Sequence, residues 1–276
     1  MLGAFYPFYR NHNSDTSISQ EFYLWESVTK SAIKAIDIRY KMLDYFYTAF
    51  HKQTVDGTPS LCPMWFVYPN DTQSLDIDLQ FFWGDAVLIS PVTQENVTTV
   101  DIYLPDDIFY DYNNNFGIVR GNGSIITLSD IDYQTIPIHI RGGTIIPLRT
   151  ESANTTTELR KKGFNIVVAP GLDGSASGSL YLDDGNSIKQ PSTSQIDFSF
   201  SNGRFSMNGS YGYDAGVNVE SITILGQTGR PAIVRIPGAS TPQYEYNSGV
   251  LVINATVPLT GDAQVTIGPE ASQGGA

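Results

Sequence analysis

This 276-residue chain opens with the sequence pattern of a single strand, a loop and a helix, and β-type sequence follows for the rest of its length. The aromatic run Ala4–Phe8 is apolar throughout, as in strands that are covered on both faces. After the polar stretch Arg10–Gln20, apolar residues recur every three or four positions. This predicts an amphipathic helix of about six turns, N-capped by Ser27 and ended by Asp56-Gly57. One such unit cannot cover its own strand, so residues 1–56 are predicted to end a larger α/β domain.

Beyond Gly57, short β-type runs alternate with turn signals such as Pro69-Asn70-Asp71, a spacing typical of β-sandwiches. We predict a proximal β-sandwich over residues 57–157 and a distal β-sandwich over 158–276, whose small, polar tail from Gly268 is disordered. The chain as a whole is predicted to be mainly β. The expected strands include Met64–Tyr68, Ala86–Ile89, Thr98–Leu104, Ile125–Leu128, Thr135–Ile140, Thr144–Leu148, Phe164–Ala169, Gly178–Leu182, Gln195–Phe200, Arg204–Gly209, Ser221–Leu225, Ala232–Ile236, Val250–Ile253 and Ala263–Ile267.

Charge and composition exclude several classes of function. The net charge is −12, so the surface repels phosphate backbones and anionic lipid, and we expect no nucleic-acid or membrane-surface partner. No apolar run approaches the roughly 18 residues of a membrane span. The single cysteine, Cys62, and three scattered histidines, His12, His51 and His139, predict neither a disulfide nor a metal site, and no cofactor is expected.

Six Asn-x-Ser/Thr sequons are more than this composition predicts by chance, although a composition accident is the alternative. With the low lysine content and the acidic balance, they predict a secreted or extracellular glycoprotein, with the vacuole or the cell surface as other locations. The first residues have no features of a signal peptide, which again suggests that the chain is not the whole protein. The expected glycosylation sites are Asn70, Asn96, Asn122, Asn154, Asn208 and Asn254.

Several short motifs resemble, in their order along the chain, those of family 31 glycoside hydrolases. The opening run with Arg10-Asn11-His12-Asn13 is similar to the last barrel strand of that family and the loop after it. Asp44 stands where proline is usual, and Phe109 stands where tryptophan is usual. The resemblance covers roughly residues 2–185. Its motifs are Leu2–Phe8 with Arg10–Asn13, Arg39–Leu43 with Tyr45–Tyr47, Phe82–Val92, Tyr103–Pro105 with Phe109–Asp111, His139–Gly143 with Ile146-Pro147, and Tyr181–Gly185.

The resemblance implies that residues 1–56 are the last strand and helix of a (β/α)8 barrel, followed by two β-sandwiches. It implies a retaining α-glucosidase that releases terminal α-linked glucose from malto-oligosaccharides or starch. Retention needs two carboxylates, and in the family both are aspartates on earlier barrel strands. Neither motif is found in this sequence. We therefore expect the chain alone to be inactive and to depend on a missing N-terminal part of the same polypeptide.

His12 is the one substrate-binding residue that the resemblance carries over, because it matches the histidine that hydrogen-bonds hydroxyls of the sugar in the −1 subsite. A histidine at the C-terminal end of a barrel strand is well placed for this role. The alternative is a loop histidine satisfied by backbone groups. Arg10 is expected to orient acids or the His12 ring, with a surface salt bridge as the alternative.

Other polar residues have simpler explanations. Asp15 and Glu21 follow His12, but loop acids are usually only solvated. Asp183-Asp184-Gly185 is expected to be a hairpin turn rather than a calcium site, because Asp-Gly supplies the positive φ that such turns need. His139 is expected to be structural. A different class of function remains open, namely a non-catalytic carbohydrate-binding β-sandwich protein with exposed aromatic residues at Tyr211, Tyr213, Tyr244 and Tyr246.

Overall fold

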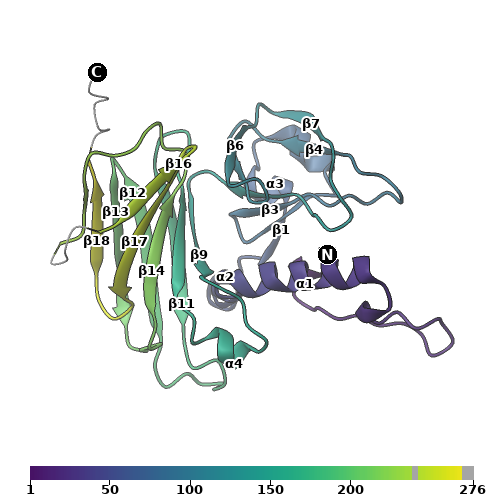
Figure 1. The fold of residues 1–276 in the computed structure, drawn as a ribbon, viewed down its shortest axis with the longest axis horizontal. Coiled ribbons are helices and arrows are strands. Elements are labelled where there is room, and N and C mark those ends of the chain that lie inside the picture. The colour runs from purple at the N-terminus through teal and green to yellow at the C-terminus, as the bar shows by residue number, and fades with distance from the viewer. Residues whose placement is uncertain (238–241, 269–276) are drawn as a thin grey trace.

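The structure, a computed structural model, describes residues 1–237 and 242–268. Two α-helices near the N-terminus lie beside a small β unit and a large sheet (Figure 1). The prediction of a mainly β chain is confirmed. The predicted disordered tail falls, beyond Gly268, outside the described residues.

The expected strand Ala4–Phe8 is wrong: this segment holds the 3-10 helix η1 (Leu2–Phe5) and then irregular backbone. A parallel strand needs neighbours for its backbone groups, and no strand of the described chain lies beside it. Side chains donate hydrogen bonds to its carbonyl oxygens instead. Arg39 donates to the carbonyl oxygens of Ala4 and Tyr6 at 2.5 and 2.8 Å, and the Trp83 indole donates to that of Phe5.

The expected single helix is divided into α1 (Glu26–Lys41) and α2 (Leu43–Asp56), preceded by the short 3-10 helix η2 (Phe22–Leu24). The first helix begins one residue before Ser27, with Trp25 at the N-cap position. Met42, with φ −91° and ψ 1°, forms the joint. Gly57 ends α2 as predicted, in the left-handed conformation with φ 79° that glycine adopts readily.

The small β unit consists of a six-stranded sheet and a two-stranded sheet, with the core cluster around Phe82, Leu88 and Phe109. The expected strand Met64–Tyr68 is wrong, because a short helix, α3 (Met64–Val67), follows Pro63 there, and the 3-10 helix η3 (Thr72–Asp76) comes next. In spatial order the six strands are β1 (Leu61–Pro63), β2 (Phe81–Trp83), β3 (Val87–Ile89), β8 (Ile138–Arg141), β5 (Ile108–Asp111) and β6 (Gly117–Arg120); the pair is β4 (Val100–Leu104) and β7 (Ser124–Leu128).

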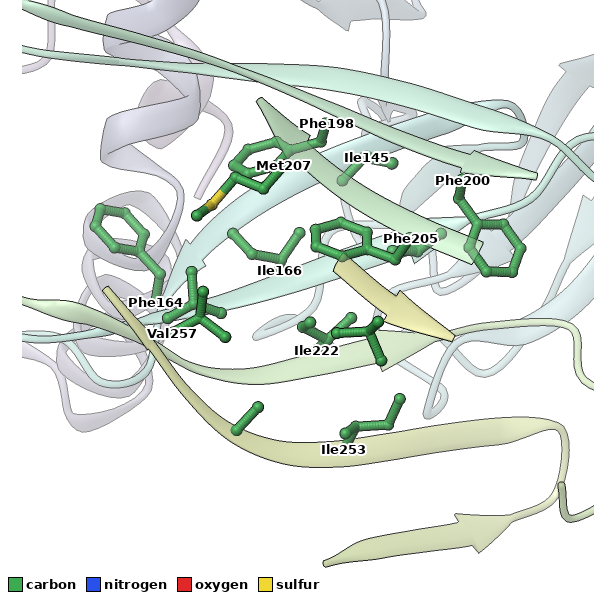
Figure 2. Packing of buried hydrophobic residues seen from close by; sticks show 14 of the residues in the cluster. Ile145, Phe164, Ile166, Phe198, Phe200, Phe205, Met207, Ile222, Ile253 and Val257 are labelled. Carbon is green, nitrogen blue, oxygen red and sulfur yellow. The ribbon is translucent and has the colours of Figure 1, made fainter. Parts of the chain in front are cut away.

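The large sheet has ten strands, and residues from strands far apart in its order share one buried cluster (Figure 2). Phe164, Phe198, Phe205 and Ile253 all point into this core, so the sheet folds over on itself. A short helix, α4 (Thr156–Leu159), lies just before strand β10 (Phe164–Ala169) in the sequence. In spatial order the strands are β15 (Val234–Arg235), β18 (Ala263–Ile267), β13 (Arg204–Tyr211), β12 (Ser194–Ser201), β11 (Ala176–Leu182), β9 (Thr144–Arg149), β10 (Phe164–Ala169), β14 (Asn218–Ile224), β17 (Val250–Pro258) and β16 (Tyr244–Asn247).

Strand β9 belongs to the ten-stranded sheet, although it precedes the predicted domain boundary at residue 157. Its two faces have different roles. Ile145 lies in the core of the large sheet, whereas Ile146 lies in a second core cluster with Phe46 of α2 and Trp83 of β2. The Phe46 and Trp83 rings stack with their centroids 4.1 Å apart. Helix α2 is therefore held by both β units. The domain boundaries themselves stay a prediction.

Candidate functional site

His12 lies in the loop between η1 and η2, in the part of the chain that precedes α1. Its side chain is exposed, and it makes no hydrogen bond with any residue that the structure describes. A hollow of about 370 Å³ adjoins it. The hollow is lined by Asn11, His12, Asn13, Gln20, Glu21, Phe22 and Tyr23. The ring nitrogens of His12 are thus free to contact a ligand, but the substrate-binding role of His12 stays a prediction.

Arg10 is not brought to the His12 ring by any contact within the described residues. Its guanidinium carbon lies 5.2 Å from the centre of the Phe8 ring, in a cation–π arrangement at the surface. Neither the orienting role nor the surface salt bridge expected for Arg10 is tested by this arrangement.

The two acids of the same loop have local partners. Ser14 Oγ donates to an oxygen of Asp15 at 3.3 Å, and Ser19 Oγ donates to Glu21 Oε2 at 2.5 Å. The hydrogen bond from Ser19 lowers the pKa of Glu21 below its usual value. Both side chains are exposed. These contacts give no sign of a carboxylate pair that shares a proton.

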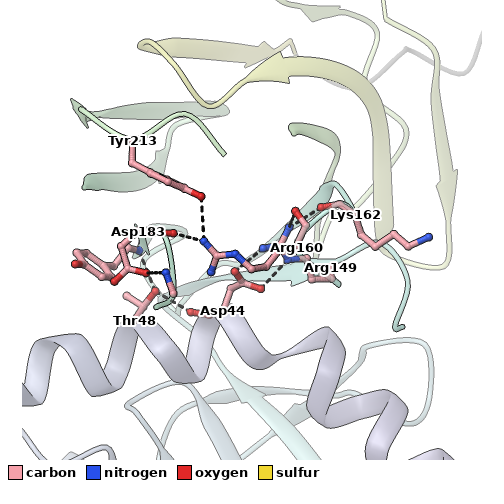
Figure 3. Close-up of polar contacts among 9 residues, drawn as sticks. Asp44, Thr48, Arg149, Arg160, Lys162, Asp183 and Tyr213 are labelled. Atoms are coloured by element: carbon pink, nitrogen blue, oxygen red, sulfur yellow. Dashed lines mark hydrogen bonds and ion pairs between the residues drawn. The ribbon is translucent and has the colours of Figure 1, made fainter. Parts of the chain in front are cut away.

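A polar junction joins helix α2 to the ten-stranded sheet (Figure 3). Arg149 of β9 donates from Nε and Nη2 to the two carboxylate oxygens of Asp44, each at 2.7 Å. The Arg149 side chain is only 2% exposed, and its guanidinium also packs over the Phe164 ring at 4.0 Å. A bidentate pair in such a position fixes both partners tightly. The sequence offered one signal for it, namely Asp44 at a position where the resembling family has proline.

Asp183, which is 2% exposed, is the second centre of this junction. It accepts hydrogen bonds from the Tyr47 hydroxyl and the Gly185 amide, each at 2.8 Å, while its carbonyl oxygen accepts from Arg160. Burial and the bond to Asp183 raise the pKa of Tyr47 to about 12. Gly185 has the expected positive φ, 71°, but the connection between the antiparallel neighbours β11 and β12 runs over residues 183–193 and is longer than the tight hairpin turn that was expected. The segment is structural: its buried aspartate holds α2 against the sheet.

The remaining histidines and the cysteine are packed into the fold. The His51 ring stacks on Tyr181 with centroids 3.5 Å apart, and burial lowers its pKa. His139 is 1% exposed, and neither ring nitrogen has a hydrogen-bond partner. Burial lowers the pKa of His139 as well, while nearby Asp111 opposes that shift. The Cys62 thiol is buried and has a pKa raised to about 11, so it is poorly reactive.

The described ranges, 1–237 and 242–268, contain no group of three or more histidine, cysteine or acidic side chains arranged to hold a metal ion. None of their helices has the length and hydropathy of a bilayer-crossing segment. The six sequon asparagines, by contrast, all have exposed side chains and are spread over the β units and their loops: Asn70, Asn96, Asn122, Asn154, Asn208 and Asn254.

Two family models match consecutive parts of the chain. Residues 1–49 match the glycosyl hydrolases family 31 TIM-barrel domain. Residues 57–146 match the glycosyl hydrolase family 31 C-terminal domain. The second match begins at Gly57, where the helical segment ends and the small β unit follows.

Curated relatives match nearly the whole chain. A probable alpha/beta-glucosidase of Neosartorya fischeri is 52% identical over 266 residues, which are 96% of this chain and 30% of the relative. An alpha-glucosidase of Schizosaccharomyces pombe is 40% identical over 250 residues, which are 90% of this chain and 26% of the relative. The chain therefore spans about 30% of the length of the first of these relatives.

A solved structure has a similar fold. A glucosidase II alpha subunit, crystallised with Glc1Man2 bound, superposes with a TM-score of 0.85 at 29% identity. The match covers 97% of this chain and 32% of that chain. The described arrangement of helices and sheets is therefore similar to about a third of a much longer solved protein.

Proposed function

The chain belongs to glycoside hydrolase family 31, and from this premise we propose that it is the C-terminal portion of a retaining α-glucosidase. The proposed reaction is hydrolysis of terminal α-linked glucose from malto-oligosaccharides or starch. One observation carries the proposal: the 52% identity over 96% of the chain to a probable alpha/beta-glucosidase.

In this proposal residues 1–56 form the C-terminal end of a (β/α)8 barrel, and residues 57–157 and 158–276 form a proximal and a distal β-sandwich. The barrel-domain match over residues 1–49 supports the first part.

The chain alone is proposed to be inactive, because retention needs a nucleophilic carboxylate and an acid–base carboxylate. Both are proposed to be aspartates on earlier barrel strands, in the part of the longer relatives that this chain does not cover. The missing part is thus the proposed intramolecular partner of this chain.

His12 is the residue of this chain that we assign to the glucose-binding subsite. Its free ring and the adjoining hollow support the assignment. Replacing His12 with alanine in the full-length enzyme should lower kcat/KM for p-nitrophenyl α-glucoside by about 1–3 kcal/mol of transition-state stabilisation. An unchanged kcat/KM would remove His12 from the site.

The alternative function, a carbohydrate-binding β-sandwich, needs exposed aromatic faces, and the four tyrosines considered for it lie differently. All four rings pack against the core of the large sheet. Tyr211 bonds to Asp262, Tyr213 to Arg160, Tyr244 to the Pro231 carbonyl and Tyr246 to the Gln227 carbonyl. No observation favours this alternative.

Secretion and glycosylation belong to the same proposal, supported by the exposure of all six sequon asparagines. The full-length enzyme, recovered from the medium of its host, should lose mass on treatment with an N-glycosidase. It should also turn over p-nitrophenyl α-glucoside and release glucose with retained α configuration. Turnover of the β-glucoside alone would refute the α-glucosidase proposal, and release of glucose with inverted configuration would refute the retaining mechanism.

A further inference from the structure

The loop that carries His12 is a hairpin with a single register. Ser17 N donates to the Ser14 carbonyl at 3.1 Å and closes a turn centred on Asp15-Thr16. Asn13 Nδ2 donates to the Ile18 carbonyl at 2.9 Å. One step further out, Asn11 Nδ2 donates to the Gln20 carbonyl at 2.5 Å. Each of these contacts joins residues placed symmetrically about the same turn, so all three specify the same pairing.

Side-chain amides, rather than backbone amides, connect the limbs of this hairpin. Between residues 10–13 and 18–21 the structure describes no backbone–backbone hydrogen bond. A hairpin of this length without a ladder slips easily in register. The two asparagine amides supply the missing cross-links at the first and third residues of the run Asn11-His12-Asn13.

His12 lies between the two asparagines, and its own ring makes no hydrogen bond within the described residues. In the same register it faces Ser19, whose hydroxyl is engaged by Glu21. The position of the His12 backbone is therefore set by its neighbours, while its ring stays available to a ligand in the adjoining hollow.

We propose that Asn11 and Asn13 are positioning residues that fix the His12 ring for sugar binding by locking the hairpin register. This inference rests on the proposed function, because it needs His12 to contact the sugar. It adds that the hydrogen-bond donors of both amides are required and that their effect passes through His12.

The test uses the full-length enzyme and the double variant N11D/N13D. Aspartate has the shape of asparagine but, when ionised, has no N–H donor and places charge against a carbonyl oxygen. Two lost hydrogen bonds should lower kcat/KM for p-nitrophenyl α-glucoside about tenfold. In an enzyme that already carries His12→Ala, the same double change should alter kcat/KM less than twofold.

Two further variants separate positioning from general damage. N11Q/N13Q keeps both donors and should recover most of the lost kcat/KM. Asn113→Asp is the matched control, because the Asn113 amide donates to the Ile136 carbonyl at 2.8 Å outside this hairpin. It should leave kcat/KM unchanged. Amide hydrogen exchange over residues 10–21 should accelerate in N11D/N13D and stay unchanged in the Asn113 variant.

The contrary outcomes are distinct. Three results would each overturn this inference while His12→Ala still impairs the enzyme. They are an unchanged kcat/KM in N11D/N13D, an equal loss of kcat/KM with and without His12, and unchanged hydrogen exchange over residues 10–21. A silent His12→Ala would overturn the assignment of His12 in the proposed function and this inference with it.

Discussion

The N-terminal segment and the ten-stranded sheet differ in how far their apolar side chains are buried. In the sheet, alternate residues of a strand such as β12 are buried, and their side chains complete one core. In the N-terminal segment, Phe8, Ile18, Tyr23 and Ile33 are each more than 60% exposed. The sheet thus finds its packing partners within this chain, whereas much of the N-terminal segment does not.

This difference shows which part of the fold depends on something else. Helix α1 buries only Ala35 and Ile38, while α2 is held by the second core cluster and by the polar junction. Monomeric proteins rarely leave several large apolar side chains of one region exposed without a reason. The uncovered side of residues 1–56 is where we expect the upstream part of the parent protein to pack.

The Asp44–Arg149 pair connects the two regions, and breaking it should have the largest effect on stability. Asp44→Ala leaves the buried guanidinium of Arg149 without its anion and should cost about 3 kcal/mol of unfolding free energy in urea titrations. The exposed pair Lys162–Glu151 is the control, since Glu151→Ala should change stability by no more than about 0.5 kcal/mol. Equal effects of the two variants would show that α2 is not anchored by the buried pair.

Acid should weaken the β region through His139. Burial holds the folded-state pKa of His139 below its ordinary value, so the neutral ring stabilises the fold at pH values above that ordinary value. The stabilisation is lost as the pH falls towards the lowered pKa. The urea midpoint should therefore drop between pH 7.5 and pH 5, and it should drop less in His139→Leu. An identical drop would assign the acid sensitivity to other groups, such as His51.

The smallest effect is expected on the uncovered face of α1. Ile33→Ser should change the stability of this chain by no more than about 0.5 kcal/mol, because the side chain is already 65% exposed. In the full-length enzyme the same substitution should cost more than about 1 kcal/mol if the upstream part buries this face. Equal small values in both proteins would mean that α1 faces solvent in the parent as well.

The local sequence pattern predicted where strands form better than it predicted which strands pair. β10 and β18 were predicted with their observed bounds, because alternation and turn residues define them locally. The strand expected at Ala4–Phe8 does not form because a strand needs neighbours, and the one expected at Met64–Tyr68 does not form because a short helix begins at Met64, directly after Pro63. The pairing of β9 with the ten-stranded sheet depends on distant residues, which no local pattern contains.

The candidate site shows the same limit. His12 could be singled out from its motif, but the motif does not reveal that its two neighbours cross-link the loop to Ile18 and Gln20. The pair of Asp44 and Arg149 joins residues 105 positions apart. Only the folded chain brings these groups together.

The most direct test is the hydrolysis of p-nitrophenyl α-glucoside by this chain and by the full-length enzyme, compared at equal molar concentration. We predict release of nitrophenol by the full-length enzyme and none above the blank by the chain alone, because both catalytic carboxylates are proposed to lie upstream. Turnover by the chain alone would contradict the account, since it would place a complete catalytic pair within these residues.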